Sequence, residues 1–301
     1  MPERLDLRTL NALEHQLAEQ FGPLSRFGLP VPLPAGIMAE AGKLVLALAS
    51  ADGELSPRER ETYLSILRSY GAPDADVDAL RAFVPGPMVV ERVVGGQKPS
   101  FLRCLVYDAI RTARVDGFAE KERTATVRIA QRLGLETGLV TAIESLLVVE
   151  DATRRARHRL LLTPEVGSMP RELLSRIGRA VLIVAASDGE LTEPEMRWFV
   201  GHMKASGAPD DLVEDFLKFD PRFAQLSDVL DERLRPFART IVFDALRTAR
   251  ADGVSLRERV IAERAAEQLR LDAGLVAAME NQLEVETAVR EARLHLLAPL
   301  R

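Results

Sequence analysis

A short Asp-Gly string recurs four times in this chain and constrains its fold more than any other feature. The copies read ADGELSPRE at 51–59, VDGFAEKE at 115–122, SDGELTEPE at 187–195 and ADGVSLRE at 251–258. Each copy lies between two segments with helical periodicity, and a glutamate follows six or seven residues after the aspartate. The string therefore predicts four helix–helix corners, each carrying the same acidic residues.

The second half of the chain repeats the first. Asp52 aligns with Asp188 without a net gap, and at the same offset DAIRTARVDG at 108–117 aligns with DALRTARADG at 244–253. A weaker symmetry inside each half relates Asp52 to Asp116 and Asp188 to Asp252. Repeats on this scale indicate a duplicated structural unit.

Every periodic segment favours helix, and we find no convincing strand pattern. The sequence predicts an all-α protein of two tandem homologous helical-bundle domains, with about six helices each, at residues 36–164 and 168–299. Residues 1–35 come before them. Leucines at helical spacing predict an amphipathic helix over 5–20, and alternating prolines predict a semi-rigid Pro-rich linker after it.

Composition excludes several classes of protein. The chain has 301 residues, 47% of them apolar, a net charge of −5 and a single cysteine. This charge argues against a nucleic-acid partner, and one cysteine permits no intrachain disulfide. No secretory signal is recognisable, and no apolar run is long enough to span a membrane. These features predict a cytoplasmic protein.

Helix capping explains much of the recurring string. Glycine ends a helix in the left-handed conformation, and Ser56, Thr192 and Ser255 each have a glutamate three residues later, as in a capping box. The copy with Ala119 lacks the hydroxyl but keeps the aspartate and the glutamate. Three of the four corners therefore have a complete capping signature.

Capping does not explain the aspartate before each glycine, because the helix dipole disfavours an anion in the last turn. Two interpretations remain open. The aspartate either accepts hydrogen bonds from the following backbone as an Asx turn, or it joins the downstream glutamate as an oxygen ligand for Ca²⁺, Mg²⁺ or Mn²⁺. The spacing is not that of an EF-hand, so a cation site requires the two corners of one domain to converge.

Asp108 and Asp244 form a second candidate feature. Each lies eight residues before an Asp-Gly and three residues before an arginine, Arg111 or Arg247. We interpret them as helix-surface ion pairs. The alternative is an additional carboxylate at the edge of the acidic site.

An Ala-rich helix followed by A-D-G-x-x-S/T-x-x-E, with a second such corner in the same half, resembles the TerB-like family of tellurite-resistance proteins. It is also similar to the N-terminal domain of DjlA-type co-chaperones. The resemblance covers both halves and implies a helical bundle, a stress-response setting and a cluster of acidic residues that binds divalent metal. Carried over by motif, the metal-binding residues are Asp52, Glu59, Asp116, Glu122, Asp188, Glu195, Asp252 and Glu258.

Enzyme motifs are absent from the sequence. None of the four histidines has metal-ligand spacing, and Cys104 lies in a buried-helix pattern where the second repeat has Thr240. The segment 36–44 fails the P-loop pattern. Arginines on the terminal helix, from Arg154 to Arg159, indicate a solvated face or a contact with an acidic partner.

The sequence therefore predicts a non-enzymatic stress-response or signalling scaffold with divalent-cation sites at its Asp-Gly corners. Two fused copies differ from single-domain family members, which favours a scaffold over a tellurite phenotype. The alternative is a metal-free protein-interaction adaptor that uses the terminal helices, and a small-molecule enzyme is a third hypothesis. We expect a protein partner, no nucleic acid and no membrane span, and the sequence is compatible with a homo-oligomer.

Overall fold

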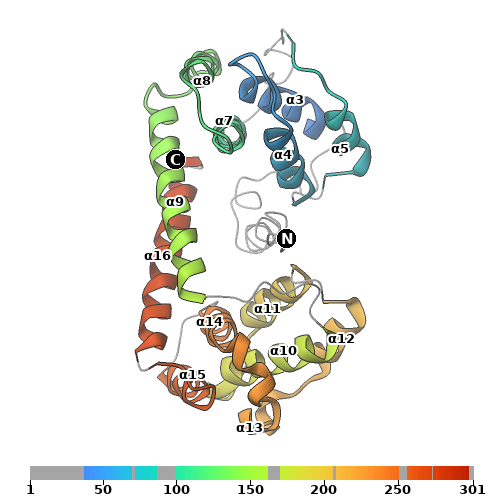
Figure 1. The fold of residues 1–301 in the computed structure, drawn as a ribbon, viewed down its shortest axis with the longest axis vertical. Coiled ribbons are helices and arrows are strands. Elements are labelled where there is room, and N and C mark those ends of the chain that lie inside the picture. Colours follow the sequence, from blue (N-terminus) through green and yellow to red (C-terminus); the bar gives the residue numbers. More distant parts are fainter. Residues whose placement is uncertain are drawn as a thin grey trace. The chain divides into compact units, whose positions relative to one another are not determined.

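The computed structural model describes residues 37–69, 72–86, 99–161, 170–205, 208–250, 256–272 and 274–297 (Figure 1). Throughout these ranges the regular structure is helical and no strand occurs, so the predicted all-α class is confirmed. In the same ranges, no helix is long and apolar enough to cross a membrane. The predicted N-terminal helix and Pro-rich linker lie outside the described residues.

Each described helix of the first half has a counterpart in the second half. The bounds of α8 and α15, and of α9 and α16, differ at both ends by the offset that separates Asp52 from Asp188. The first half contains α3 (Ile37–Ala49), α4 (Pro57–Ser69), α5 (Asp74–Arg81), α7 (Pro99–Ala113), α8 (Glu120–Arg132) and α9 (Leu139–Leu161). The second contains α10 (Arg171–Ala185), η1 (Ala186–Asp188), α11 (Glu193–Ala205), α12 (Asp210–Lys218), η2 (Pro221–Phe223), α13 (Leu226–Val229), η3 (Glu232–Phe237), α14 (Ala238–Ala249), α15 (Leu256–Gln268) and α16 (Leu275–Leu297).

The chain divides into two compact units, and the division falls inside the two long terminal helices. Of the described residues, the N-terminal unit comprises those up to Asp151 together with those from Val289 onward, and the C-terminal unit comprises those from Ala152 to Ala288. Each unit thus includes the end of a helix that begins in the other half of the sequence. The domain boundaries predicted from the repeat, at 164 and 168, stay a prediction.

In the N-terminal unit, α3 and α7 form the centre and α4, α5 and α8 pack around them (Figure 1). Both central helices are apolar on most sides, as expected of helices that other helices surround. Val45 and Leu46 on α3 and Val106 and Ile110 on α7 are completely buried. The Ala-rich and Leu-rich runs of the sequence therefore form the core.

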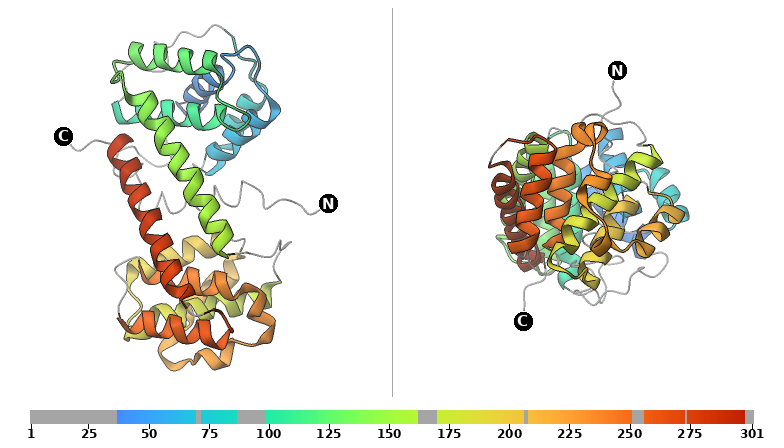
Figure 2. Two further views of the ribbon diagram at one scale, coloured as in Figure 1. Left: turned by 60° about the vertical axis from the view of Figure 1, so that its left-hand side comes forward. Right: turned by 90° about the horizontal axis from the view of Figure 1, so that it is seen from below.

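The C-terminal unit repeats this arrangement with α10 and α14 at its centre. Helices α11, α12 and α15 pack against this pair, and the short α13 lies against α10 (Figure 2, yellow to orange). Val184 on α10 and Ile241 and Leu246 on α14 are completely buried. The segment between α12 and α14 forms the short helices η2, α13 and η3.

A glycine sets how closely the first helix of each unit approaches the third. A Cβ atom on Gly42 of α3 would lie 2.5 Å from Cδ1 of Leu80 on α5. In the C-terminal unit, a Cβ on Gly178 of α10 would overlap the ring of Phe216 on α12. Gly178 and Phe216 are the repeat equivalents of Gly42 and Leu80, so both units use the same close approach.

We expect Gly178→Ala to lower the free energy of unfolding by about 1 kcal/mol. Overpacking costs about 1–3 kcal/mol, and the higher helix propensity of alanine offsets up to about 1 kcal/mol of that. Urea denaturation measures the change. The double variant with Phe216→Leu should lose less free energy of unfolding than the two single variants lose together, because a leucine can move away from the new methyl group. Strictly additive effects would contradict this account.

Candidate functional site

The first Asp-Gly corner connects α3 to α4 and has the geometry of a tight turn. Gly53 has a φ of 120°, a left-handed value that other residues rarely adopt. Oδ1 of Asp52 accepts a hydrogen bond from the backbone N–H of Glu54 at 3.1 Å. This contact is that of an Asx turn, as one of the two interpretations of the aspartate requires.

A complete capping box follows at the start of α4. The backbone N–H of Glu59 donates to Oγ of Ser56 at 3.1 Å, and the N–H of Ser56 donates to Oε2 of Glu59 at 2.8 Å. The predicted capping box is therefore confirmed. Glu59 is only 3% exposed, so the box also buries a carboxylate.

The second corner connects α7 to α8 and forms half of the same box. Gly117 has a φ of 126°, and Oε2 of Glu122 accepts a hydrogen bond from the N–H of Ala119 at 2.5 Å. Ala119 has no hydroxyl group with which to complete the exchange. Glu122 is 2% exposed and is thus buried like Glu59.

The two corners of the N-terminal unit converge. Ser56 Oγ donates a hydrogen bond to Oδ2 of Asp116, and so joins the first corner to the second across a long stretch of sequence. We call the four carboxylates at this point, Asp52, Glu59, Asp116 and Glu122, the acidic junction. The sequence predicts this convergence as a requirement of a cation site, and the structure brings all four predicted residues of this unit together.

Burial and the neighbouring carboxylates of the acidic junction raise the pKa of its two glutamates. Burial raises the pKa of Glu122 to about 7, the hydrogen bond from Ala119 opposes that shift, and the charges of Glu59, Asp52 and Asp116 add to it. Burial likewise raises the pKa of Glu59, and the charges of Asp116 and Asp52 raise it further. The acidic junction therefore holds more negative charge than its surroundings compensate.

The acidic junction is not arranged as a finished coordination shell. Across the described ranges, no group of three or more His, Cys, Asp or Glu side chains has a geometry that could hold a metal ion. Glu59 and Glu122 each use Oε2 to cap a helix, whereas Asp52 and Asp116 are exposed to solvent. The carboxylate groups that do not cap a helix are the two aspartates and the Oε1 atoms of the two glutamates, and a cation would have to draw these oxygens closer together.

The C-terminal unit repeats the first corner. Gly189 has a φ of 112°, and the N–H of Thr192 donates to Oε2 of Glu195 at 2.8 Å. Glu195 is 2% exposed, as buried as its equivalent Glu59. The side chains of Asp188 and Glu258, and the whole of Asp252, lie outside the described residues, so the second predicted site stays a prediction.

Asp108 and Asp244 are not on the surface. Each is 5% exposed, so their interpretation as helix-surface ion pairs is wrong. The central helices α7 and α14 are covered on all sides, which buries their polar residues with the apolar ones. Oδ2 of Asp244 lies 3.1 Å from Nε2 of His202.

The sequence does not single out His202, which has no metal-ligand spacing and is partly buried on α11. The His202 ring stacks on Trp198, with centroids 5.0 Å apart, and the Arg247 guanidinium lies 5.4 Å from the centre of the Trp198 ring. A comparison of the two repeats could have identified this pair of side chains. His202 aligns with Ile66 and Trp198 with Thr62, so two positions on one helix change together from the first repeat to the second.

The described residues thus define an all-helical protein with paired Asp-Gly corners and, in its N-terminal unit, a convergent cluster of acidic residues. No family model and no curated protein matches the chain. A tellurite resistance protein from Nostoc punctiforme, known from its crystal structure, is similar to it. The two are 26% identical, with a TM-score of 0.40, and the similarity covers 44% of this chain and 84% of that protein.

We expect Glu122→Gln to stabilise the N-terminal unit at neutral pH by about 1 kcal/mol, since a pKa shift of one unit corresponds to about 1.4 kcal/mol before screening by water. The amide oxygen still accepts the hydrogen bond from Ala119, and the repulsion disappears. Because the pKa of Glu122 is raised from 4.5 to about 7 on folding, the unfolded chain loses this proton first, and stability falls as pH rises through this interval.

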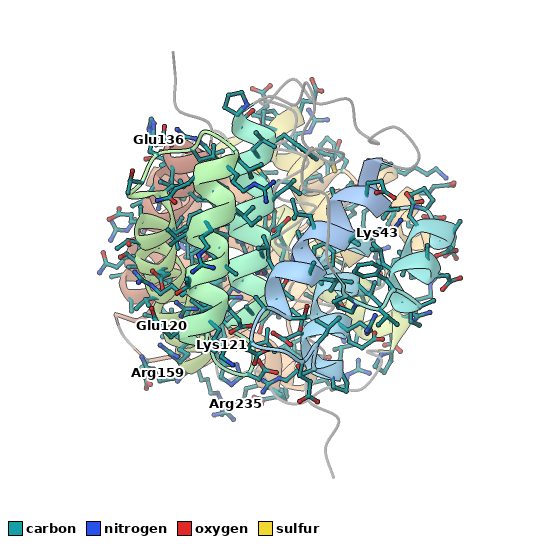
Figure 3. The ribbon with its side chains drawn as sticks, turned by 90° about the horizontal axis from the view of Figure 1, so that it is seen from above. Lys43, Glu120, Lys121, Glu136, Arg159 and Arg235 are labelled. Atoms are coloured by element: carbon teal, nitrogen blue, oxygen red, sulfur yellow. The ribbon has the colours of Figure 1, made fainter. Side chains whose placement is uncertain are left out.

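Thermal unfolding between pH 5 and 8 tests this expectation. The wild-type midpoint should fall more steeply with pH than that of Glu122→Gln. Glu120→Gln is the matched control, because Glu120 is an exposed glutamate on the same turn of α8 (Figure 3). Equal pH slopes for the wild type and Glu122→Gln would contradict the expected role of Glu122.

Proposed function

We propose that the protein is a non-enzymatic helical scaffold whose acidic junction binds a divalent cation, Ca²⁺, Mg²⁺ or Mn²⁺. One observation carries the proposal: two corners that are distant in sequence bring four carboxylates together. Capping alone does not require that convergence, since each helix is capped within its own corner. A stress-response setting and a cytoplasmic location rest on the sequence analysis.

A cation would relieve the repulsion that raises the pKa of Glu59 and Glu122. Hard cations prefer carboxylate oxygens, and the exposed Asp52 and Asp116 are accessible to an ion from solvent. Protons and metal compete for the same carboxylates, so binding should strengthen as pH rises. An ion held by both corners would link the α3–α4 pair to the α7–α8 pair and make the bundle more rigid.

Thermal unfolding of the metal-stripped protein with each ion tests the proposal. An ion at one hundred times its dissociation constant should stabilise the folded state by about 2.7 kcal/mol. At one fixed ion concentration, the stabilisation should be larger at pH 8 than at pH 5.5. Asp52→Asn/Asp116→Asn should abolish the shift. Asparagine can still accept the hydrogen bonds from Glu54 and Ser56, so the corners themselves should remain folded.

Glu214→Gln/Glu267→Gln is the control with the same change in charge, because both glutamates are exposed on helices of the C-terminal unit. This variant should keep the full shift. If no ion stabilises the wild type at pH 8, or if the Asp52→Asn/Asp116→Asn variant responds as the wild type does, the cation proposal is wrong. Asp188→Asn/Asp252→Asn extends the test to the second repeat.

Exposed apolar side chains on the terminal helices support a second candidate, a metal-free interaction adaptor. Val148 and Val149 on α9 are 53% and 48% exposed, and Val285, the repeat equivalent of Val149, is 49% exposed. Apolar side chains in adjacent positions suit contact with a protein partner. Absence of any ion effect in the unfolding experiment would favour this candidate.

A further inference from the structure

The two terminal helices make the same contact twice. In the N-terminal unit, Arg293 of α16 pairs with Glu150 of α9, with Nη1 and Oε1 3.5 Å apart. In the C-terminal unit, Arg157 of α9 pairs with Glu286 of α16, also with 3.5 Å between the charged atoms. The repeat relates Glu150 to Glu286 and Arg157 to Arg293, so the second pair is the first with the helices exchanged.

A second contact between the repeats also occurs twice, with the helices exchanged. Nη1 of Arg103 on α7 donates a hydrogen bond to the backbone oxygen of Leu296, near the end of α16, at 2.7 Å. Nη1 of Arg239 on α14 donates to the backbone oxygen of Leu160, near the end of α9, at 2.8 Å. Arg239 is the equivalent of Arg103, and Leu296 that of Leu160. Each arginine thus holds the last turn of the other repeat's terminal helix.

These contacts are part of the packing of each unit. The four charged side chains of the two ion pairs are between 10% and 19% exposed, so water screens them little. The hydroxyl group of Tyr107 also donates to Oε2 of Glu150 at 2.6 Å, and Nε2 of Gln282 donates to Oε1 of Glu286 at 3.0 Å. Leu297 is 3% exposed and belongs to the core of the N-terminal unit.

An interface in which residue i contacts j while j contacts i is isologous, the kind that two copies of one surface form with each other. We propose that the α9/α16 contact is such a self-complementary face, so that the terminal helices can be exchanged with those of a second copy of this chain, with α9 of one copy against α16 of the other. The proposal rests on the repeated contacts alone and is independent of cation binding at the acidic junction.

The covalent link between the two helices determines when a second copy binds. Within one chain the two helices meet at an effective concentration in the millimolar range, so at micromolar concentration the contact forms within the chain. Exchange between chains should dominate only when the contact within the chain is unfavourable and the contact between chains is favourable. Charge substitutions on the face can create that condition.

Two variants of the full-length chain provide the test. The acid variant, Arg157→Glu/Arg293→Glu, sets glutamate against glutamate within the chain, and the base variant, Glu150→Lys/Glu286→Lys, sets lysine against arginine. When the two are mixed and exchange helices, every pair becomes complementary. Light scattering after size exclusion should give the mass of one chain for each variant alone and for the wild type, and twice that mass for the equimolar mixture.

Arg155→Glu/Arg159→Glu is the matched control for the acid variant. It has the same change in charge, at two exposed positions of α9 outside the ion pairs. Mixed with the base variant, it should keep the mass of one chain. The proposal is overturned if the acid–base mixture also keeps that mass while both variants are helical by circular dichroism. It is equally overturned if the control mixture doubles in mass, or if either variant doubles alone.

The base variant removes the carboxylate that holds Tyr107, and it could fail to fold for that reason alone. In that event, Arg157→Glu mixed with Glu286→Lys tests the same face and leaves Glu150 in place. Doubling of the mass in that mixture supports the self-complementary face, and the mass of one chain overturns it.

Discussion

The structure depends on one recurring interaction, a hydrogen bond from the backbone N–H at the start of a helix to a buried glutamate three residues later. It occurs at Ser56, Ala119 and Thr192, with Glu59, Glu122 and Glu195 as the acceptors. The bond satisfies a donor that the helix leaves unpaired, and it fixes how the chain enters the helix. It also holds a carboxylate away from water. The acidic junction exists because two such corners meet.

Local sequence rules predicted the parts of the fold that local chemistry determines. The capping signature of Ser56 and Glu59 predicted the start of α4. Convergence at the acidic junction was predicted only as a condition, because it depends on packing between segments that are distant in sequence. The structure meets that condition in the N-terminal unit, and the capping glutamates there proved to be buried.

The missed features share a physical cause. The sequence predicted helix-surface ion pairs for Asp108 and Asp244. Neighbouring helices cover α7 and α14 at these positions and bury both aspartates. Helical periodicity identifies the apolar face of a helix but does not say which helix covers it. For the same reason, the pattern of α9 could not reveal that Arg157 pairs with a glutamate of α16. Buried polar groups such as Asp244 and His202 then favour one packing over others, because an unsatisfied charge in the interior is costly.

The exchange of terminal helix ends also determines when the protein can fold during its synthesis. The core of the N-terminal unit includes Leu297, with Val289 and Leu296 packed against it. Domains commonly fold in the order in which the ribosome makes them, but this unit lacks part of its core until Leu297 has been added. The first half of the chain must therefore wait for the second. Loss of the last turn of α16 would destabilise the N-terminal unit, although the rest of that unit ends at Asp151 in the sequence.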